Sequence, residues 1–255
     1  MKATIPNRYA RPARGALLIL VLAAVVSGPA SALAGGFNLS WGDCGSNGGA
    51  AKTFACNSDM GTNVMYVSAM PNSPMPQFVA MLTQISVYSS QQSLPSWWHL
   101  ETPGGCRSRA LSATFDFTAG PFSCTDPWAG QAMGGTSWVY WGLEPSARAR
   151  LRVVAAVAAP ITLNSGTEYY MCAISITNGS TTGGGGCAGC SDPLCFVMDN
   201  VQLSNPDASQ VQTLVDPLLR QRITWQSSAS AMGSDCAAGS TPKQSTWGGL
   251  KSLYH

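Results

Sequence analysis

The chain has 255 residues, of which 45% are hydrophobic and only 10% are charged, and its formal net charge is +2. This nearly neutral balance excludes the strongly basic surface of a nucleic-acid-binding protein. The length suits one domain with a sizeable core, since β-sandwich domains of about 200–250 residues are common.

Residues 1–34 have the three parts of a secretory signal peptide. Four basic residues are followed by the apolar run 16–26, and small residues precede an expected cleavage after Ala34. The apolar run is shorter than the ~20 residues of a membrane helix, and no later run is longer, so we expect no integral membrane span. The mature chain is therefore expected to be secreted, extracellular or periplasmic, with a net charge of about −2.

The mature chain is predicted to be mostly strand. Runs with β-branched, aromatic or alternating character occur at 64–70, 78–88, 111–117, 137–143, 147–158, 168–177, 194–203 and 222–226. Turn-rich stretches separate them. This spacing predicts an all-β domain over residues 35–226, an antiparallel β-sandwich of jelly-roll-like type stapled by disulfides.

The C-terminal part has a different pattern. Residues 208–215 fit a helix, with a strand as a nearly equal alternative, and residues 227–246 have the Ser/Ala/Gly-rich composition of a linker. In the tail 247–255 the apolar residues at 247, 250, 253 and 254 fit one helical face. We expect the tail to pack on the domain, with a docking or sorting signal as the alternative.

All nine cysteines follow the expected cleavage site, and an exported protein oxidises its thiols in pairs. The disulfide candidates are Cys44, Cys56, Cys106, Cys124, Cys187, Cys190, Cys195 and Cys236. Cys172 is the expected odd thiol, because residues 169–176 have the pattern of a buried strand, where cysteine packs as a small apolar residue.

The pairing stays open. Cys44 and Cys56 would close a short local loop, and Cys106 and Cys124 bracket the strand at 111–117. The group of Cys187, Cys190 and Cys195 favours structural disulfides over a zinc or redox site, because no histidine lies near it.

No catalytic residue, metal site or cofactor is predicted. His99 would share one side of a strand with Trp97 and Glu101, but no nucleophile motif accompanies a general base there, which favours a structural histidine. Glycoside hydrolysis would need two carboxylates from among Glu101, Asp116, Glu144 and Glu168. A calcium site would have to use loop oxygens, which turn capping explains equally well; the candidates are Asp43, Asp59, Asp192, Asp199 and Asn200.

Two sets of side chains are candidates for ligand binding. An exposed aromatic face for sugars or proteins would involve Trp97, Trp98, Trp138 and Trp141, although tryptophans also fill the core of a wide sandwich. Arg148, Arg150 and Arg152 alternate with apolar residues and are expected on the solvent face of a strand. They would meet an anionic glycan or a carboxylate-bearing partner, or protect an edge strand from pairing, and the second interpretation is favoured.

Five stretches of the sequence resemble one group of proteins: 38–44, 54–57, 115–126, 187–190 and 246–254. The group consists of uncharacterised, secreted, cysteine-containing bacterial proteins with a C-terminal TWGxxKSLY tail, and the resemblance covers nearly the whole mature chain. It implies no catalytic residues, because none are established for the group. The position of Cys172 is not a cysteine in the group's pattern, which agrees with its choice as the odd thiol.

Together these observations predict a secreted, non-enzymatic β-sandwich protein with a binding or surface-structural role. The expected partner is a glycan or an extracellular protein, and no nucleic acid. The alternative is a secreted polysaccharide-acting hydrolase that uses paired carboxylates.

Overall fold

The computed structural model describes residues 35–89, 91–140 and 147–227. The predicted signal peptide, Trp141, Glu144, Cys236, nearly all of the predicted linker and the predicted tail lie outside the described residues. No helix in the described part of the chain is long and apolar enough to cross a membrane.

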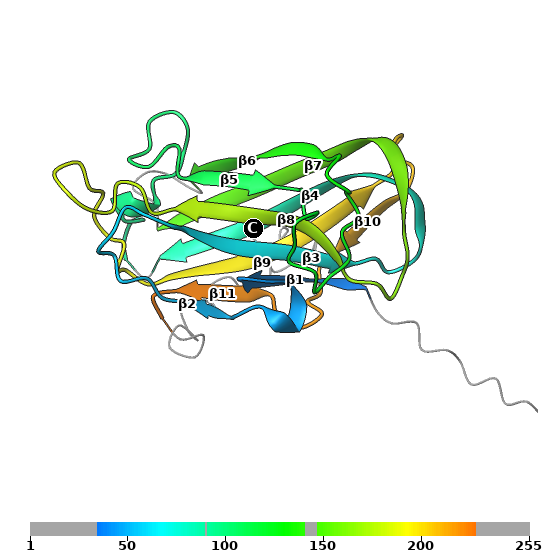
Figure 1. The fold of residues 1–255 in the computed structure, drawn as a ribbon, viewed down its shortest axis with the longest axis horizontal. Coiled ribbons are helices and arrows are strands. Elements are labelled where there is room, and N and C mark those ends of the chain that lie inside the picture. The colour runs from blue at the N-terminus through cyan, green and yellow to red at the C-terminus, as the bar shows by residue number, and fades with distance from the viewer. Residues whose placement is uncertain (1–34, 90, 141–146, 228–255) are drawn as a thin grey trace, which may run out of the picture. The chain divides into compact units, whose positions relative to one another are not determined.

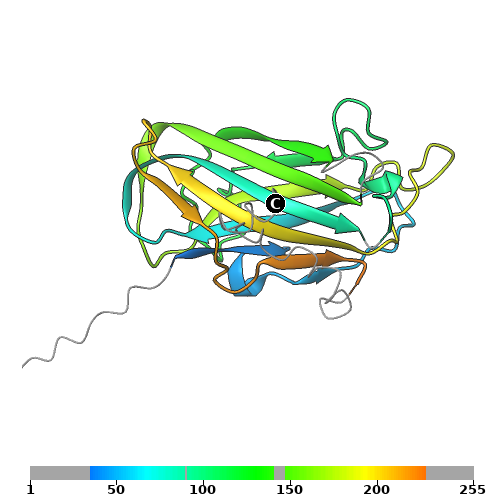
Figure 2. The same cartoon turned by 180° about the vertical axis from the view of Figure 1, so that it is seen from behind.

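The strands form two sheets, seen from opposite sides in Figures 1 and 2. Sheet A has the order β1 (Gly36–Trp41), β3 (Thr62–Met70), β8 (Tyr169–Thr177) and β5 (Leu111–Thr114). Sheet B has the order β2 (Ala51–Lys52), β11 (Arg222–Trp225), β9 (Leu194–Ser204), β4 (Met75–Ser89), β7 (Arg148–Leu163) and β6 (Met133–Tyr140), and β10 (Val211–Leu214) also pairs with β9. Two short 3-10 turns, η1 (Gly45–Asn47) and η2 (Ser96–Trp98), complete the regular elements. Apart from the parallel pair β2 and β11, the strand pairings are antiparallel, so the predicted antiparallel sandwich is confirmed.

Each of the eight predicted runs overlaps a strand, because the alternation of apolar and polar residues reports which face of a sheet is buried. The helix expected at 208–215 is wrong, since β10 occupies Val211–Leu214 there. Strand β1 was not predicted, although Phe37, Leu39 and Trp41 alternate with polar residues as in a strand; the side chains on both of its faces are buried. On its outer side Asn38 donates to the Glu168 carboxylate (2.7 Å) and accepts from the amides of Leu219 and Arg220.

The core lies between the sheets and contains the tryptophans. Trp97, Trp98 and Trp138 are 0%, 0% and 5% exposed, so an exposed aromatic face built on them is wrong. Trp97 stacks on Trp225 with ring centroids 5.2 Å apart, and Trp98 packs against both of these rings. Burial of large aromatic rings is one of the strongest apolar contributions to a core, which explains why this wide sandwich uses them as filling.

Three disulfides join distant parts of the chain. They pair Cys44 with Cys124, Cys56 with Cys190, and Cys106 with Cys187. The local bridge between Cys44 and Cys56 is therefore wrong, as is a bridge between Cys106 and Cys124. Cys195 is also disulfide-bonded. Cys172 is a free thiol, fully buried in β8, as its strand pattern predicted.

Candidate functional site

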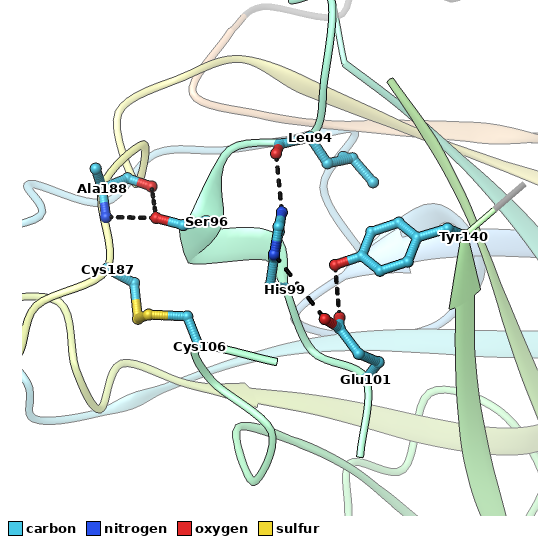
Figure 3. A network of polar contacts seen from close by, with 8 residues as sticks. All are labelled: Leu94, Ser96, His99, Glu101, Cys106, Tyr140, Cys187 and Ala188. Carbon is cyan, nitrogen blue, oxygen red and sulfur yellow. Dashed lines mark hydrogen bonds and ion pairs between the residues drawn. A yellow bond between two sulfur atoms is a disulfide. The ribbon is translucent and has the colours of Figure 1, made fainter. Parts of the chain in front are cut away.

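The arrangement closest to a catalytic one surrounds His99, directly after η2 (Figure 3). The Nε2 atom of His99 lies 3.1 Å from the carbonyl oxygen of Leu94. Its Nδ1 atom lies 3.9 Å from the carboxylate of Glu101, which also accepts a 2.6 Å hydrogen bond from the Tyr140 hydroxyl at the end of β6. Both ring nitrogens of His99 therefore face acceptors within the protein.

The segment that carries His99 is anchored to the loop before β9. The Ser96 hydroxyl donates to the Ala188 carbonyl (3.1 Å) and accepts from the Ala188 amide (2.9 Å). The Cys106–Cys187 disulfide ties the same two loops together (Figure 3). These contacts hold the loop after β4 against the end of the sandwich.

This geometry does not fit a histidine that activates a nucleophile. A carbonyl oxygen carries no proton, so the Nε2 atom must be the donor to Leu94, and the remaining nitrogen is turned toward Glu101. A general base needs a nitrogen within hydrogen-bond reach of the group it deprotonates, and among the described residues the group that faces Nδ1 is the Glu101 carboxylate. The contacts of Ser96 are with Ala188, so this hydroxyl is not a partner of the ring.

The candidate carboxylates have separate sets of partners. Glu101 binds Tyr140 and faces His99, whereas Asp116 accepts from the amide and hydroxyl of Thr118, contacts that lower the pKa of Asp116. Glu168 accepts from Asn38 and from the Ser68 hydroxyl (2.5 Å). These contacts give no support to two acids facing one another across a cleft.

Three of the acidic residues considered for calcium accept hydrogen bonds within the protein, most of them from distant parts of the chain. Asp43 accepts from the amide of Cys44 and from the hydroxyls of Tyr170 and Ser123. Asp59 accepts from the amides of Thr181 and Thr182, both at 2.8 Å, and these bonds hold its pKa below the usual range. Asp199 accepts from Ser86, and burial raises its pKa. Within the described residues, no group of three or more His, Cys, Asp or Glu side chains is placed to hold a metal.

Arg107 is a buried charge that the sequence analysis did not single out. Its guanidinium lies over the Trp97 ring, 3.4 Å from the centroid, and donates to the carbonyl oxygens of Trp97, Thr177 and Gly179. Burial lowers the pKa of Arg107 to about 10, so it stays charged at neutral pH. Because its donors are directed at the backbone, Arg107 joins the loop after η2 to the end of β8.

The three arginines of β7 lie on the outer face of sheet B, which Figure 2 shows in front. Arg148 and Arg152 are exposed and Arg150 is half-buried, so the expected solvent-facing row is present. Strand β7 pairs with β4 on one side and β6 on the other, so the favoured explanation, protection of an edge strand, is wrong.

The arginines have different surroundings. The Arg148 guanidinium lies 5.4 Å from the ring centroid of Tyr88, and Arg150 acts electrostatically on Asp199. Arg152 pairs with Gln84 and Ser137 in the strand ladder. It lies two residues before Val154, which lines an apolar hollow of about 320 Å³. We call this feature the outer hollow; it is lined by Ala80, Met81, Leu82, Met133, Val154, Ala155, Ala156 and Ser204.

The outer hollow was missed, although the sequence contained a signal for it. The two-residue period that places Arg148, Arg150 and Arg152 outside also places Val154 and Ala156 outside. Val154 is 49% exposed, and Met133, the partner of Ala156 in the ladder between β6 and β7, is 80% exposed. Trp138 alternates with these outward residues and points into the core.

No family model, no curated protein and no solved structure is significantly similar to this chain.

Proposed function

We propose that this protein is exported and acts without catalysis, by binding a carboxylate-bearing partner through the outer face of sheet B. The observation that carries the proposal is the position of Arg152, exposed beside the outer hollow. Arg152 and Val154 are two residues apart on β7 and point to the same side, so their Cα atoms are roughly 7 Å apart.

This pair of features suits a ligand with an acidic group next to an apolar face. The arginine guanidinium forms charge-assisted, bidentate hydrogen bonds with carboxylates. Exposed apolar side chains such as Met133 and Val154 would cover the nonpolar face of a sugar ring or side chain. A uronic-acid glycan has both groups, and it is the first ligand class we propose.

Among the described residues, the ring nitrogens of His99 face Leu94 and Glu101 and not a nucleophile, which supports binding without turnover. The disulfides support export, since such bonds persist in oxidising compartments. A polysaccharide hydrolase that uses paired carboxylates is the alternative, and Glu101 is its best-placed acid.

A glycan array of uronic-acid and neutral polysaccharides, probed with the purified mature chain, tests the proposal. We expect binding to the acidic glycans that weakens with added salt, and a loss of about tenfold in affinity for Arg152→Gln. Arg109→Gln, which changes an exposed arginine elsewhere, is the matched control and should bind normally.

Two results would overturn the proposal. Equal binding by wild type and Arg152→Gln would remove the outer face of sheet B from the site. Release of shorter saccharides that stops in Glu101→Gln would instead favour the hydrolase.

A further inference from the structure

The strand β6 has an open side. Sheet B ends at β6, which pairs with β7 and, among the described residues, with no strand on its other side. It lies at the upper border of the sandwich in Figure 1. An edge strand presents a row of backbone amides and carbonyls that can pair with another chain, and proteins commonly protect such an edge.

The sequence of β6 carries little protection of this kind. Residues 133–140 include no proline and no charged side chain. The register between β6 and β7 runs without a shift over all eight residues of β6, so no bulge twists the edge away. At Gly135 no described atom beyond the adjacent residues lies within 4 Å of the place that a Cβ would take, so the backbone there is open to an approaching chain.

The other sheet edges are shorter or already paired. On the side of β1 away from β3, the Phe37 amide donates to the Asp216 carbonyl (3.1 Å) and the Leu39 amide donates to the Arg220 carbonyl (2.9 Å). Strands β5 and β10 have four residues each, and β2 has two. With eight residues, β6 is therefore the longest open edge in the part of the chain that the structure describes.

The outward side chains of β6 have a self-complementary order. Trp138 points into the core, so Met133 and Val139 point to the outer face of sheet B by alternation. They are 80% and 45% exposed, and each lies three residues from Thr136. When two copies of β6 pair antiparallel about Thr136, the Met133 of each copy lies directly opposite the Val139 of the other. Directly opposite side chains share a face, so each exposed apolar side chain covers another.

We propose that the protein forms a dimer in which β6 of one copy pairs antiparallel with β6 of a second copy, about a twofold axis at Thr136. Backbone hydrogen bonds across the edge join the two B sheets into one continuous sheet. A twofold interface must be self-complementary, and the order of Met133 and Val139 has this property. Because the contact is one strand wide, we expect a weak dimer with a dissociation constant of roughly 1–100 µM.

The dimer would present two ligand sites on one side. A twofold axis perpendicular to the continuous sheet leaves both outer faces on the same side, with the two Met133 residues about 20 Å apart along the strands. Met133 lines the outer hollow, so a long acidic glycan would contact both hollows, and two linked contacts raise the overall affinity. This consequence rests on the proposed function, whereas the dimer itself does not.

Two double variants test the pairing and its register. Both replace Met133 by lysine, and Val139 is replaced by glutamate in one and by lysine in the other. In the proposed dimer, Met133→Lys/Val139→Glu places opposite charges across the two copies, whereas Met133→Lys/Val139→Lys places like charges there. Within one copy the two positions are about 20 Å apart, beyond the reach of the screened charges. Sedimentation equilibrium of the mature chain, from about 1 to 200 µM, measures the association.

We expect wild type and Met133→Lys/Val139→Glu to form dimers with similar dissociation constants. Met133→Lys/Val139→Lys should weaken the dimer by about tenfold or more, because like charges meet at two places in it. Val211→Lys changes an exposed valine of β10 and is the control, which should form dimers as wild type does. A monomeric wild type, equal association of the two double variants, or an equally large effect of Val211→Lys would overturn the proposal.

Glycan binding separates this proposal from the proposed function. A short uronic-acid oligosaccharide should bind equally to the two double variants, and a long polymer should bind more tightly to the variant with opposite charges. A dimer that binds neither glycan would overturn the proposed function, whereas a monomer that binds the short glycan would overturn the pairing of β6.

Discussion

Replacing Cys56 and Cys190 by alanine opens the disulfide loop with the largest sequence separation, 134 residues. A disulfide stabilises a protein mainly by restricting its unfolded chain, and a loop of this length closed alone is worth about 5 kcal/mol on the chain-entropy model. When the two other bridges are intact, the loop that the Cys56–Cys190 bridge closes is much shorter than its sequence separation. They connect Cys56 to Cys190 through three short segments, 44–56, 106–124 and 187–190, a covalent route of roughly 33 residues, for which the same relation gives about 4 kcal/mol.

The same three short segments form the route whichever bridge is removed. Each of the three double cysteine-to-alanine variants should therefore lose a similar free energy of unfolding, about 4 kcal/mol, although the sequence separations are 80, 134 and 81. Urea unfolding followed by tryptophan fluorescence measures this loss, because the rings of the core become exposed. Losses below about 1 kcal/mol, or losses that differ by more than about 2 kcal/mol among the three variants, would refute the reasoning.

Three further predictions concern buried groups. Arg107→Gln should lower the free energy of unfolding, measured by urea titration, by about 3–5 kcal/mol, because three carbonyls lose a charged donor. The control Arg109→Gln should lower it by less than about 0.5 kcal/mol. Equal effects of the two substitutions would contradict the role given to Arg107. Burial and the hydrogen bond to Asp43 raise the pKa of Tyr170 to about 12, so the neutral hydroxyl stabilises the fold below the unfolded pKa, and this stability is lost as the pH rises from about 10 to 12. In this pH window the midpoint temperature of thermal unfolding should fall more steeply for wild type than for Tyr170→Phe. Parallel curves of midpoint against pH would contradict the role given to the Tyr170 hydroxyl. Burial raises the pKa of Cys172 far above its usual range, so a thiol reagent should modify it only after unfolding, and rapid modification of the native protein would show that β8 is not packed as described.

Local pattern was enough to predict most of the fold. The strands β4, β7, β8 and β9 have long runs with a two-residue period or continuous apolar character, and both patterns report burial directly. The free thiol of Cys172 could be selected for the same reason, since its whole strand is apolar.

The disulfide pairing could not be predicted from the sequence. Cys44 and Cys56 are close in the sequence, but their partners, Cys124 and Cys190, lie on loops that only the assembled sandwich brings near them. Strand β10 was ambiguous because it is four residues long, and its pairing with β9 decides its conformation.

The candidate site was predicted only in part. The outward direction of Arg152 follows from alternation, but the central position of β7 depends on the order of strands in sheet B. Trp97 and Trp98 lie in a turn-rich stretch, where exposure was a reasonable expectation, yet η2 turns both rings into the core. Arg107 gave no signal in the sequence, because its partners are backbone carbonyls from distant loops.

Long-range disulfides lock this sheet-built domain. Peptide mapping of the protein purified from its natural host, denatured in the presence of an alkylating reagent and digested without reduction, tests this most directly. The account predicts linked peptides that pair Cys44 with Cys124, Cys56 with Cys190 and Cys106 with Cys187, with Cys172 as the free thiol. Alkylated, reduced cysteines at these six positions, or local pairs such as Cys44 with Cys56, would contradict it.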